Sequence, residues 1–318
     1  MYINKTKLAN TFRRRKGQWI ANIFLFLFFV GMVYIFTFPL LYMVSVAIRE
    51  PASVKDPSVV WIPKQLSVKS ITETIKIMDY WKSLGLTCRI TFGATLASLA
   101  SCVLAGYGIA RFNFKGKGIV SLLVILTIVI PPLSLMNATY LSFRYFDLGG
   151  ILSLLGIGSF NLLNTEWTFI LPALFGCGLR NGLFIFIFRQ FFIGMPKELE
   201  EAAYIDGCGH FGTFLRVMLP NSRSAFITVL LFSFIWHWND YYSASTYFID
   251  GVKPLSVMLY NLQGMIQNAG IGTGGASPYL LRTYLQSGAL LCILPPLVLY
   301  IFAQRYFTES IERTGIVG

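Results

Sequence analysis

Two short segments hold most of the side chains that could do chemistry in this 318-residue chain. The first combines aromatic rings with an imidazole, an amide and a carboxylate: Trp236, His237, Trp238, Asn239, Asp240, Tyr241 and Tyr242. Aromatic faces stack on sugar rings, and Asn and Asp side chains offer hydrogen-bond partners to hydroxyl groups. The segment suits a path for a carbohydrate, and a polar contact between packed helices with aromatic packing is the equal alternative.

Catalysis by this segment is disfavoured. His237 and Asp240 lie three residues apart and could touch on one helix, but the sequence offers no second catalytic carboxylate, no Ser–His pair and no metal-ligand spacing. Arg180 belongs with the segment as a further candidate, because a charge inside an apolar stretch is functional by default. It could meet an anionic sugar or Asp240, or make a purely structural contact.

The second segment is acidic. Glu198, Glu200, Glu201 and Asp206 fall within nine residues, although the whole chain has only 14 acidic residues. Pro196 suits the first position of a helix, and acids in a first turn complement the positive end of the helix dipole.

Leu199, Ala202, Ala203 and Asp206 are spaced to share one face of this helix, and the two alanines permit close approach of another surface. Residues 207–209 break the helix, and a second short helix follows over residues 211–218. An amphipathic loop lying on the membrane is one reading of this pair. An acidic first turn is repelled by anionic lipid, which favours a docking element for a cytosolic partner.

Composition places both segments in a membrane protein. The chain is 55% hydrophobic and 13% charged, against about 25% charged in soluble domains, and its mean hydropathy is +0.63. The 16% aromatic content excludes intrinsic disorder. Six apolar segments are long enough to cross a bilayer as helices, which predicts an all-α integral membrane protein with six transmembrane helices. They are residues 19–46, 86–110, 118–141, 167–192, 224–248 and 284–302.

The distribution of cations predicts the orientation. Six Lys and Arg residues and no acid precede Trp19, and Arg111, Lys115 and Lys117 follow the second span, whereas the loops after the third and fifth spans are poor in cations. Both termini are therefore predicted to be cytoplasmic. The net charge of +12 is explained by cations that set the orientation in the membrane and lie near anionic lipid headgroups. Nucleic-acid binding is excluded because no folded soluble domain carries a basic face.

The predicted organisation has five parts. They are a basic cytoplasmic tail (1–18), the first transmembrane helix (19–48), an extracytoplasmic loop (49–85), a core (86–306) and a cytoplasmic C-tail (307–318). The core includes the acidic helix pair as a cytoplasmic loop between the fourth and fifth spans (195–220) and an outer loop (249–283).

The acidic segment resembles a known motif. Glu201-Ala202-Ala203, three residues, Gly207, nine residues and then Val217-Met218-Leu219-Pro220 are similar to the EAA loop of permease subunits of bacterial ABC importers, with Val217 replacing the usual Ile. Four further stretches resemble the MalG-type permease subunit of carbohydrate-uptake importers, over most of residues 85–318. These are Tyr107-Gly108-Ile109-Ala110-Arg111-Phe112, Ile130-Pro131-Pro132, Trp238-Asn239-Asp240 and Thr314-Gly315-Ile316-Val317-Gly318.

The resemblance implies that the acidic helix docks in a cleft of a cytosolic ATPase subunit and couples ATP hydrolysis to rotation of the spans. By position, Glu201 would pair with a cation on the ATPase, Ala202 and Ala203 would pack, and Gly207 would permit the turn. The implied coupling residues are Glu201, Ala202, Ala203, Asp206, Gly207, Leu219 and Pro220. The chain lacks the phosphate-binding pattern G-x-x-x-x-G-K-[ST], so ATP and Mg would be bound by the partner. The chain is then expected to be no enzyme, with no cofactor or metal of its own.

The expected assembly lies in the bacterial cell membrane and contains a second permease subunit, two ATPase subunits and an extracytoplasmic solute-binding protein. The substrate path would use Trp236, Trp238, Asn239, Asp240, Tyr241 and Arg180, although in this family the substrate can be held mainly by the second permease. The outer tip would contact the binding protein through Gly270, Gly272, Gly274 and Gly275.

Two other transporter classes compete. An ABC importer permease for a non-sugar solute is disfavoured by the matches at residues 107–112 and 238–240. An ion-coupled secondary transporter would show internal repeats and membrane carboxylates, but no clear repeat is present and Asp240 is the one carboxylate well inside a span.

Overall fold

The computed structural model describes residues 5–51, 62–271 and 277–315, and in these ranges the regular structure is helical, with two isolated β-bridges and no strand. The chain divides into two compact units. Unit 1 comprises Met1–Thr74 and Ile266–Leu290, and unit 2 comprises Ile75–Met265 and Leu291–Gly318.

Unit 1 is dominated by the long helix α1 (Lys5–Ala47), whose apolar stretch Ala21–Ala47 is long enough to cross a membrane. Most of this stretch is exposed, whereas Met43, Val46 and Ala47 near its end are buried. Two polar contacts join the two sequence segments of this unit. The Arg282 guanidinium lies over the Tyr42 ring, 5.0 Å from its centroid, and the Tyr284 hydroxyl donates a hydrogen bond to the Glu73 carboxylate.

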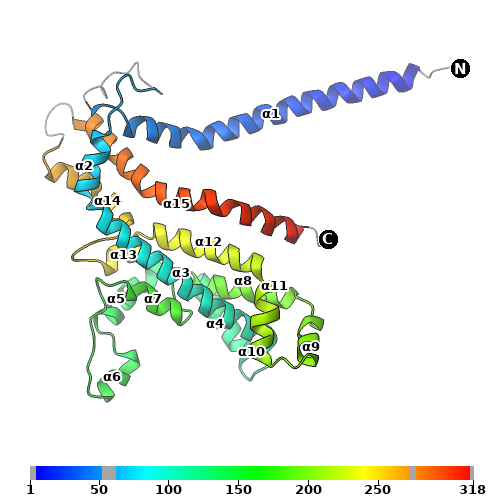
Figure 1. Cartoon of the computed structure of the whole chain (residues 1–318), viewed down its shortest axis with the longest axis vertical. Helices are drawn as coiled ribbons and strands as arrows, with labels where there is room; N and C mark the ends of the chain where they lie inside the picture. Colours follow the sequence, from blue (N-terminus) through cyan, green and yellow to red (C-terminus); the bar gives the residue numbers. More distant parts are fainter. Residues whose placement is uncertain (1–4, 52–61, 272–276, 316–318) are drawn as a thin grey trace. The chain divides into compact units, whose positions relative to one another are not determined.

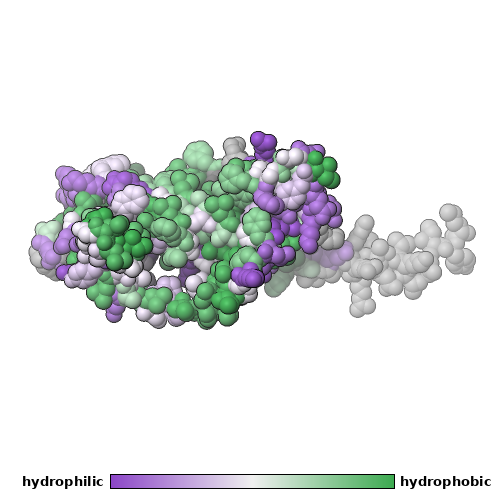
Figure 2. All heavy atoms as spheres, turned by 90° about the horizontal axis from the view of Figure 1, so that it is seen from below, coloured by the Kyte–Doolittle hydropathy of each residue, from purple (hydrophilic) through white to green (hydrophobic). Residues whose placement is uncertain are grey.

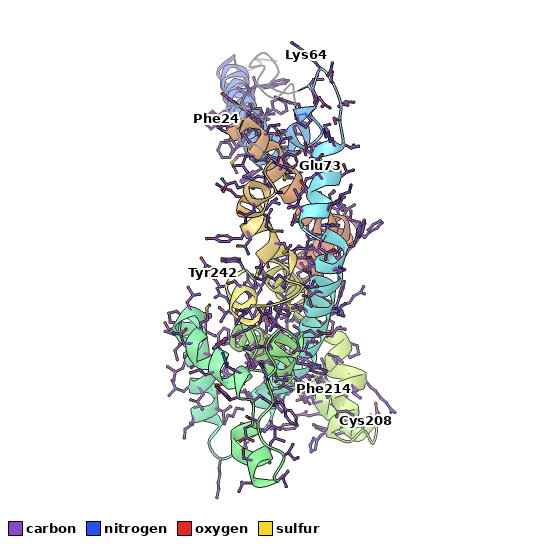
Figure 3. The ribbon with its side chains drawn as sticks, turned by 90° about the vertical axis from the view of Figure 1, so that its left-hand side faces the viewer. Phe24, Lys64, Glu73, Cys208, Phe214 and Tyr242 are labelled. Carbon is purple, nitrogen blue, oxygen red and sulfur yellow. The ribbon has the colours of Figure 1, made fainter. Side chains whose placement is uncertain are left out.

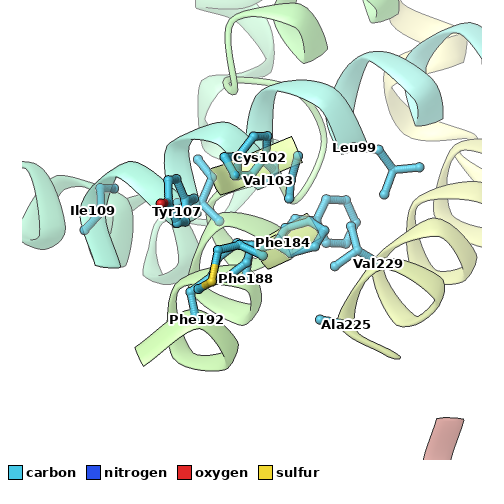
Figure 4. Close-up of a cluster of buried hydrophobic side chains, with 13 residues drawn as sticks. Leu99, Cys102, Val103, Tyr107, Ile109, Phe184, Phe188, Phe192, Ala225 and Val229 are labelled. Atoms are coloured by element: carbon cyan, nitrogen blue, oxygen red, sulfur yellow. The ribbon is translucent and has the colours of Figure 1, made fainter. Parts of the chain in front are cut away.

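Unit 2 is built around α3 (Tyr80–Arg111), which packs against α7 (Trp167–Leu174), α8 (Asn181–Gly194) and α12 (Arg223–Asn239). Near the C-terminal end of α3, buried side chains from these helices form a core that includes Tyr107, Phe184, Phe188, Phe192 and Val229 (Figure 4). Aromatic side chains fill this core because they bury a large apolar area with few rotatable bonds.

The other helices of the two units complete the fold. They are α2 (Lys69–Ile77), α4 (Lys117–Val129), η2 (Pro132–Leu135), α5 (Met136–Arg144), η3 (Leu148–Gly150), α6 (Ile151–Leu154), α9 (Glu198–Ile205), α10 (His210–Thr213), η4 (Phe214–Met218), α11 (Leu219–Asn221), α13 (Tyr242–Tyr247), α14 (Leu255–Asn268) and α15 (Ser277–Gly315). Figure 1 shows α9 and α10 at the C-terminal end of α3, and α13 toward the opposite end.

In the part of the chain that the structure describes, three helices are long and apolar enough to span a membrane, within Ala21–Ala47, Tyr80–Arg111 and Pro278–Phe302. Two bent helix pairs raise the number to five if each pair is one span. One pair, Lys117–Val129 with Pro132–Arg144, bends by 99° at a break that contains Pro131. The bend follows from the missing amide hydrogens and fixed backbone of the two prolines.

The fourth predicted span, residues 167–192, is not one continuous helix. The structure divides it into α7 and α8, separated by residues 175–180, where Gly176 and Arg180 take the left-handed conformation at φ 71° and 60°. Two such residues cannot continue a right-handed helix. Arg180 therefore lies at a break in the helix, immediately before the first residue of α8.

Much of the surface is apolar, as expected for helices that face lipid. Large side chains such as Leu96, Ile119, Leu122 and Phe232 are exposed. Figure 2 shows hydrophobic side chains spread over much of one face of the molecule. A soluble protein rarely exposes apolar area on this scale, which agrees with a multi-pass membrane protein.

Gly106 brings α3 and α8 into close contact and supplies a test of this packing. A Cβ atom at Gly106 would lie 2.5 Å from Cβ of Phe188 and 3.0 Å from the backbone nitrogen of Arg189. We expect Gly106→Ala to destabilise the chain by about 1–3 kcal/mol, because backbone leaves little room to yield. The measurement is thermal unfolding of the purified chain in detergent.

Gly108→Ala is the matched control, since a Cβ there meets only the Phe112 ring at 4.0 Å. Both substitutions gain the same helix propensity, about 1 kcal/mol. Equal melting temperatures for the two variants would contradict the close packing of α3 on α8.

Candidate functional site

Residues 195–220, here called the coupling segment, form the helix pair expected from the sequence. Helix α9 begins at Glu198, two residues after Pro196, and carries three acids in its first turn. After a turn, α10, the π-helical η4 and α11 follow without interruption. Figure 3 shows Cys208 at the outer edge of this segment and Phe214 further in, against the helices. The segment is thus anchored on one side and open on the other.

Gly207 makes the turn that ends α9. Its φ of +82° is left-handed, its amide donates to the carbonyl of Tyr204 at 3.0 Å, and the amide of Cys208 donates to the carbonyl of Ala203 at 2.9 Å. This pair of bonds is a Schellman motif, which favours glycine because a Cβ is strained at positive φ. A Cβ at Gly207 would meet no atom within 4 Å, so the backbone conformation alone requires glycine.

Glu200 fixes α9 to α3, a role that does not follow from its place among the clustered acids of the sequence. Tyr107 donates a hydrogen bond from its hydroxyl to Oε1 of Glu200 at 2.8 Å, and Nε of Arg111 lies 3.5 Å from Oε2. The side chains of Arg111 and Glu200 are only 7% and 12% exposed. Arg111 also donates from Nη2 to the carbonyl of Met195 at 2.7 Å. The carboxylate is thus held by two residues one helical turn apart.

Aromatic packing strengthens the same junction. The Tyr107 ring lies 4.9 Å from the Phe214 ring and 5.3 Å from the Phe192 ring, measured between centroids. Phe214 and Met218 of η4 belong to the buried core near the C-terminal end of α3. The coupling segment therefore forms part of the core of unit 2 and is more than a loop on its surface.

The predicted coupling residues divide by exposure. Glu201, Ala202, Asp206, Gly207 and Pro220 are exposed. Ala203, by contrast, is 5% exposed and packs within the chain, and Leu219 is half-buried against the core. Of the two alanines expected to face a partner, only Ala202 is presented on the surface.

The residues of the aromatic segment of the fifth predicted span differ in burial and in the groups that they contact. Helix α12 ends at Asn239. Trp238 is buried and donates its indole hydrogen to the carbonyl of Cys292 at 3.2 Å. Asp240 accepts the amide of Ser243 on Oδ1 at 3.1 Å, close to the start of α13. The Tyr241 ring packs on Tyr260 of α14, with centroids 4.2 Å apart.

Trp236 and Asn239 remain accessible. Trp236 is half-buried, and Asn239 is exposed with its amide bonded to the carbonyl of Ile235 at 3.0 Å. The Trp236 ring stacks with Phe184 and Phe232, at centroid distances of 5.6 and 5.3 Å. The Arg180 guanidinium lies over the same ring, 5.3 Å from its centroid. Arg180 thus contacts Trp236, and no ion pair with Asp240 occurs among the residues described.

The break that carries Arg180 is held by its neighbours. Asn181 is buried, and its Oδ1 accepts the Ser98 hydroxyl at 2.8 Å while its Nδ2 donates to the carbonyl of Ala173 at 3.3 Å. A Cβ at Gly182 would come within 1.9 Å of Oγ1 of Thr127. The backbone next to Arg180 is therefore fixed against both α3 and α4.

The outer tip is described only in part. Gly270 follows α14 with a left-handed φ of 71° and is exposed. Gly272, Gly274 and Gly275 lie outside the described residues. Within the described ranges, no group of three or more His, Cys, Asp or Glu side chains could hold a metal ion.

Comparison with known proteins agrees with this architecture. Residues 97–313 match the family model of the binding-protein-dependent transport system inner membrane component. Protein LplC of Bacillus subtilis is 27% identical and the match covers 97% of this chain and 99% of that protein. The arabinooligosaccharides transport system permease protein AraQ of Halalkalibacterium halodurans is 27% identical over 96% of this chain and 100% of its own length. The polygalacturonan/rhamnogalacturonan transport system permease protein YtcP of Bacillus subtilis is 26% identical over 94% of this chain and 99% of its own length.

A crystal structure of a bacterial ABC transporter involved in the import of the acidic polysaccharide alginate contains a chain of the same fold. The TM-score is 0.69 at 21% identity, and the match covers 96% of this chain and 99% of that one. The resemblance drawn from the EAA-like loop is thereby confirmed. The chain belongs to the family of binding-protein-dependent transport system inner membrane components, the permease subunits of ABC importers.

Proposed function

We propose that this chain is a transmembrane permease subunit of an ATP-driven importer for a sugar or oligosaccharide. It forms half of the translocation path and transmits ATP hydrolysis by a cytosolic partner, while catalysing no reaction itself. Relatives whose names specify arabinooligosaccharides and polygalacturonan support a carbohydrate substrate. The observation that carries the coupling role is the exposed face of α9, with Glu201 and Ala202 beside the left-handed Gly207.

The proposed topology has six crossings and both termini in the cytoplasm. The crossings are α1, α3, the bent pair α4–α5, the divided pair α7–α8, α12 with its preceding and following short helices, and α15. The domain boundaries stay as predicted, with the core at 86–306 and its two loops at 195–220 and 249–283. Cations before Trp19 and after the second span support this orientation.

The proposed assembly adds a second permease subunit, two ATPase subunits and an extracytoplasmic binding protein in a bacterial cell membrane. Glu201, Ala202, Asp206 and Gly207 would meet the ATPase, with Ala203, Leu219 and Pro220 supporting them. The outer tip at Gly270, Gly272, Gly274 and Gly275 would meet the binding protein. Arg180, Trp236 and Asn239 would line the substrate path. Trp238, Asp240 and Tyr241 would support the residues that line it.

The Glu200 junction gives this coupling a physical route. A buried carboxylate that is hydrogen-bonded to Tyr107 and ion-paired with Arg111 resists separation from α3, because breaking the ion pair leaves an unpaired buried charge. Displacement of α9 by a partner would therefore carry the end of α3 with it. A rigid link of this kind fits a transporter that alternates between two global states.

Glu200→Gln tests the junction. The amide oxygen can still accept from the Tyr107 hydroxyl, but the charge opposite Arg111 is lost. We expect hydrogen–deuterium exchange of the α9 amides to speed up by about 10-fold or more, since breaking a buried ion pair is costly. Glu198→Gln, an exposed acid on the same turn, is the control. Equal protection in the two variants would contradict the anchoring role of Glu200.

Glu201→Ala and Gly207→Pro test the coupling surface. Glu201 is exposed, so its loss removes only a contact to a partner, whereas proline at position 207 removes the amide bond to Tyr204 and cannot take a positive φ. We expect both variants to insert and assemble, with sugar uptake per ATP hydrolysed reduced about 10-fold or more. Uptake and hydrolysis are measured together in vesicles that contain the complete importer.

Glu198→Ala serves as the control for these two variants, because it changes an exposed acid of the same helix. Normal transport by both Glu201→Ala and Gly207→Pro would refute the assignment of the coupling surface. Absence of any sugar that stimulates hydrolysis by the wild-type importer would instead refute the carbohydrate substrate.

A further inference from the structure

Arg180 is a charged residue in the interior of the fourth predicted span, and it is exposed on the surface of the chain. Hydrocarbon is a poor environment for a guanidinium, and such residues face water-filled cavities or opposite charges. Arg180 has no ion-pair partner among the residues that the structure describes. Its charge is thus available to a group outside this chain.

Trp236 orients this charge. The guanidinium lies over the indole ring at 5.3 Å, and the ring also stacks with Phe184, which is fully buried, and with Phe232. A guanidinium over an aromatic face keeps its in-plane N–H groups free to donate. Those donors match the two oxygens of a carboxylate, or of a phosphate, in a bidentate pair.

The backbone that presents Arg180 is equally fixed. Arg180 itself is left-handed, Asn181 is bonded to Ser98 and Ala173, and Gly182 lies against Thr127 with no room for a side chain. A site that is held in place before binding does not lose free energy to ordering. The arrangement thus has the charge, the geometry and the rigidity of an anion-binding position.

We propose that Arg180, oriented by Trp236, recognises the negatively charged group of an acidic saccharide in the translocation path. This inference rests on the proposed sugar-importer function and specifies its substrate class. Carboxylate and phosphate groups share the recognition chemistry, and the test includes one sugar of each kind. A pairing of Arg180 with an acid of the second permease is the competing arrangement.

The test uses the complete importer in lipid vesicles, with uptake of three probes compared: a uronic-acid oligosaccharide, a sugar phosphate and a neutral oligosaccharide of similar size. The readout is the ratio of anionic to neutral uptake. We expect Arg180→Gln to lower this ratio about 10-fold or more, and Arg180→Lys to give an intermediate value, because lysine keeps the charge without the planar fork. The probe whose ratio falls identifies carboxylate or phosphate as the recognised group.

Arg144→Gln is the matched control. Arg144 is also an exposed guanidinium over an aromatic ring, 5.8 Å from the centroid of Tyr145, but it ends α5 and lies outside the proposed path. Its substitution should leave the ratio unchanged. Trp236→Phe should lower the ratio less than Arg180→Gln does, because a smaller ring still supports the guanidinium.

Four results would overturn the inference. Wild-type importer that takes up only the neutral probe would refute an acidic substrate while leaving the proposed function intact. An unchanged ratio in Arg180→Gln would refute the role of this residue. Loss of the second permease from the purified Arg180→Gln importer would assign Arg180 to the subunit interface. Failure of the wild type with all three probes would refute the proposed function as well.

Discussion

Gly106 places the backbone of α8 directly against α3, and most of unit 2 is arranged around that contact. A side chain here would overlap Cβ of Phe188, so the two helices are as close as their main chains allow. Phe184, Phe188 and Phe192 then project from α8 into the core beside Tyr107. Because Phe214 and Met218 of the coupling segment fill the same core, the packing that stabilises the helices also fixes the coupling segment.

Helix α3 consequently touches both functional regions. Its C-terminal end holds α9 through Tyr107, Arg111 and Glu200, and its middle holds the break before α8 through Ser98 and Asn181. These contacts lie on one continuous helix of 32 residues. In the proposed mechanism, a movement imposed on α9 reaches the environment of Arg180 along this helix, with no further element required.

Hydropathy predicted the long apolar helices, since these follow from local composition. The spans within 19–46, 86–110 and 284–302 correspond to helices α1, α3 and α15, and Pro131 lies at the observed bend. The sequence of Arg180, Asn181 and Gly182 interrupts the apolar run of the fourth span, and the observed break lies over residues 175–180, directly before Asn181. Gly176 and Gly178 are further local signals of this break.

For the site, the turn at Gly207 was predictable because glycine takes a left-handed φ without strain. The burial of Glu200 was not predictable, because a glutamate within a cluster of acidic residues is expected to face solvent. Its partners Tyr107 and Arg111 did leave a signal in the sequence. They lie one turn apart near the end of a span, and so offer a hydroxyl and a cation on one side of the helix. The inward direction of Trp238 depends on tertiary packing against Cys292 and leaves no local signal.

The break before α8 also constrains how such a chain can diverge. Position 182 has no space beyond a hydrogen atom, and Asn181 is committed to Ser98 and Ala173. Position 180 differs, because its side chain is exposed and contacts the Trp236 ring instead of the buried core. Single substitutions at position 180 can thus alter the charge offered to a substrate while the fold is kept. A homologue could therefore change its substrate specificity through one substitution at position 180 while it keeps Asn181 and Gly182.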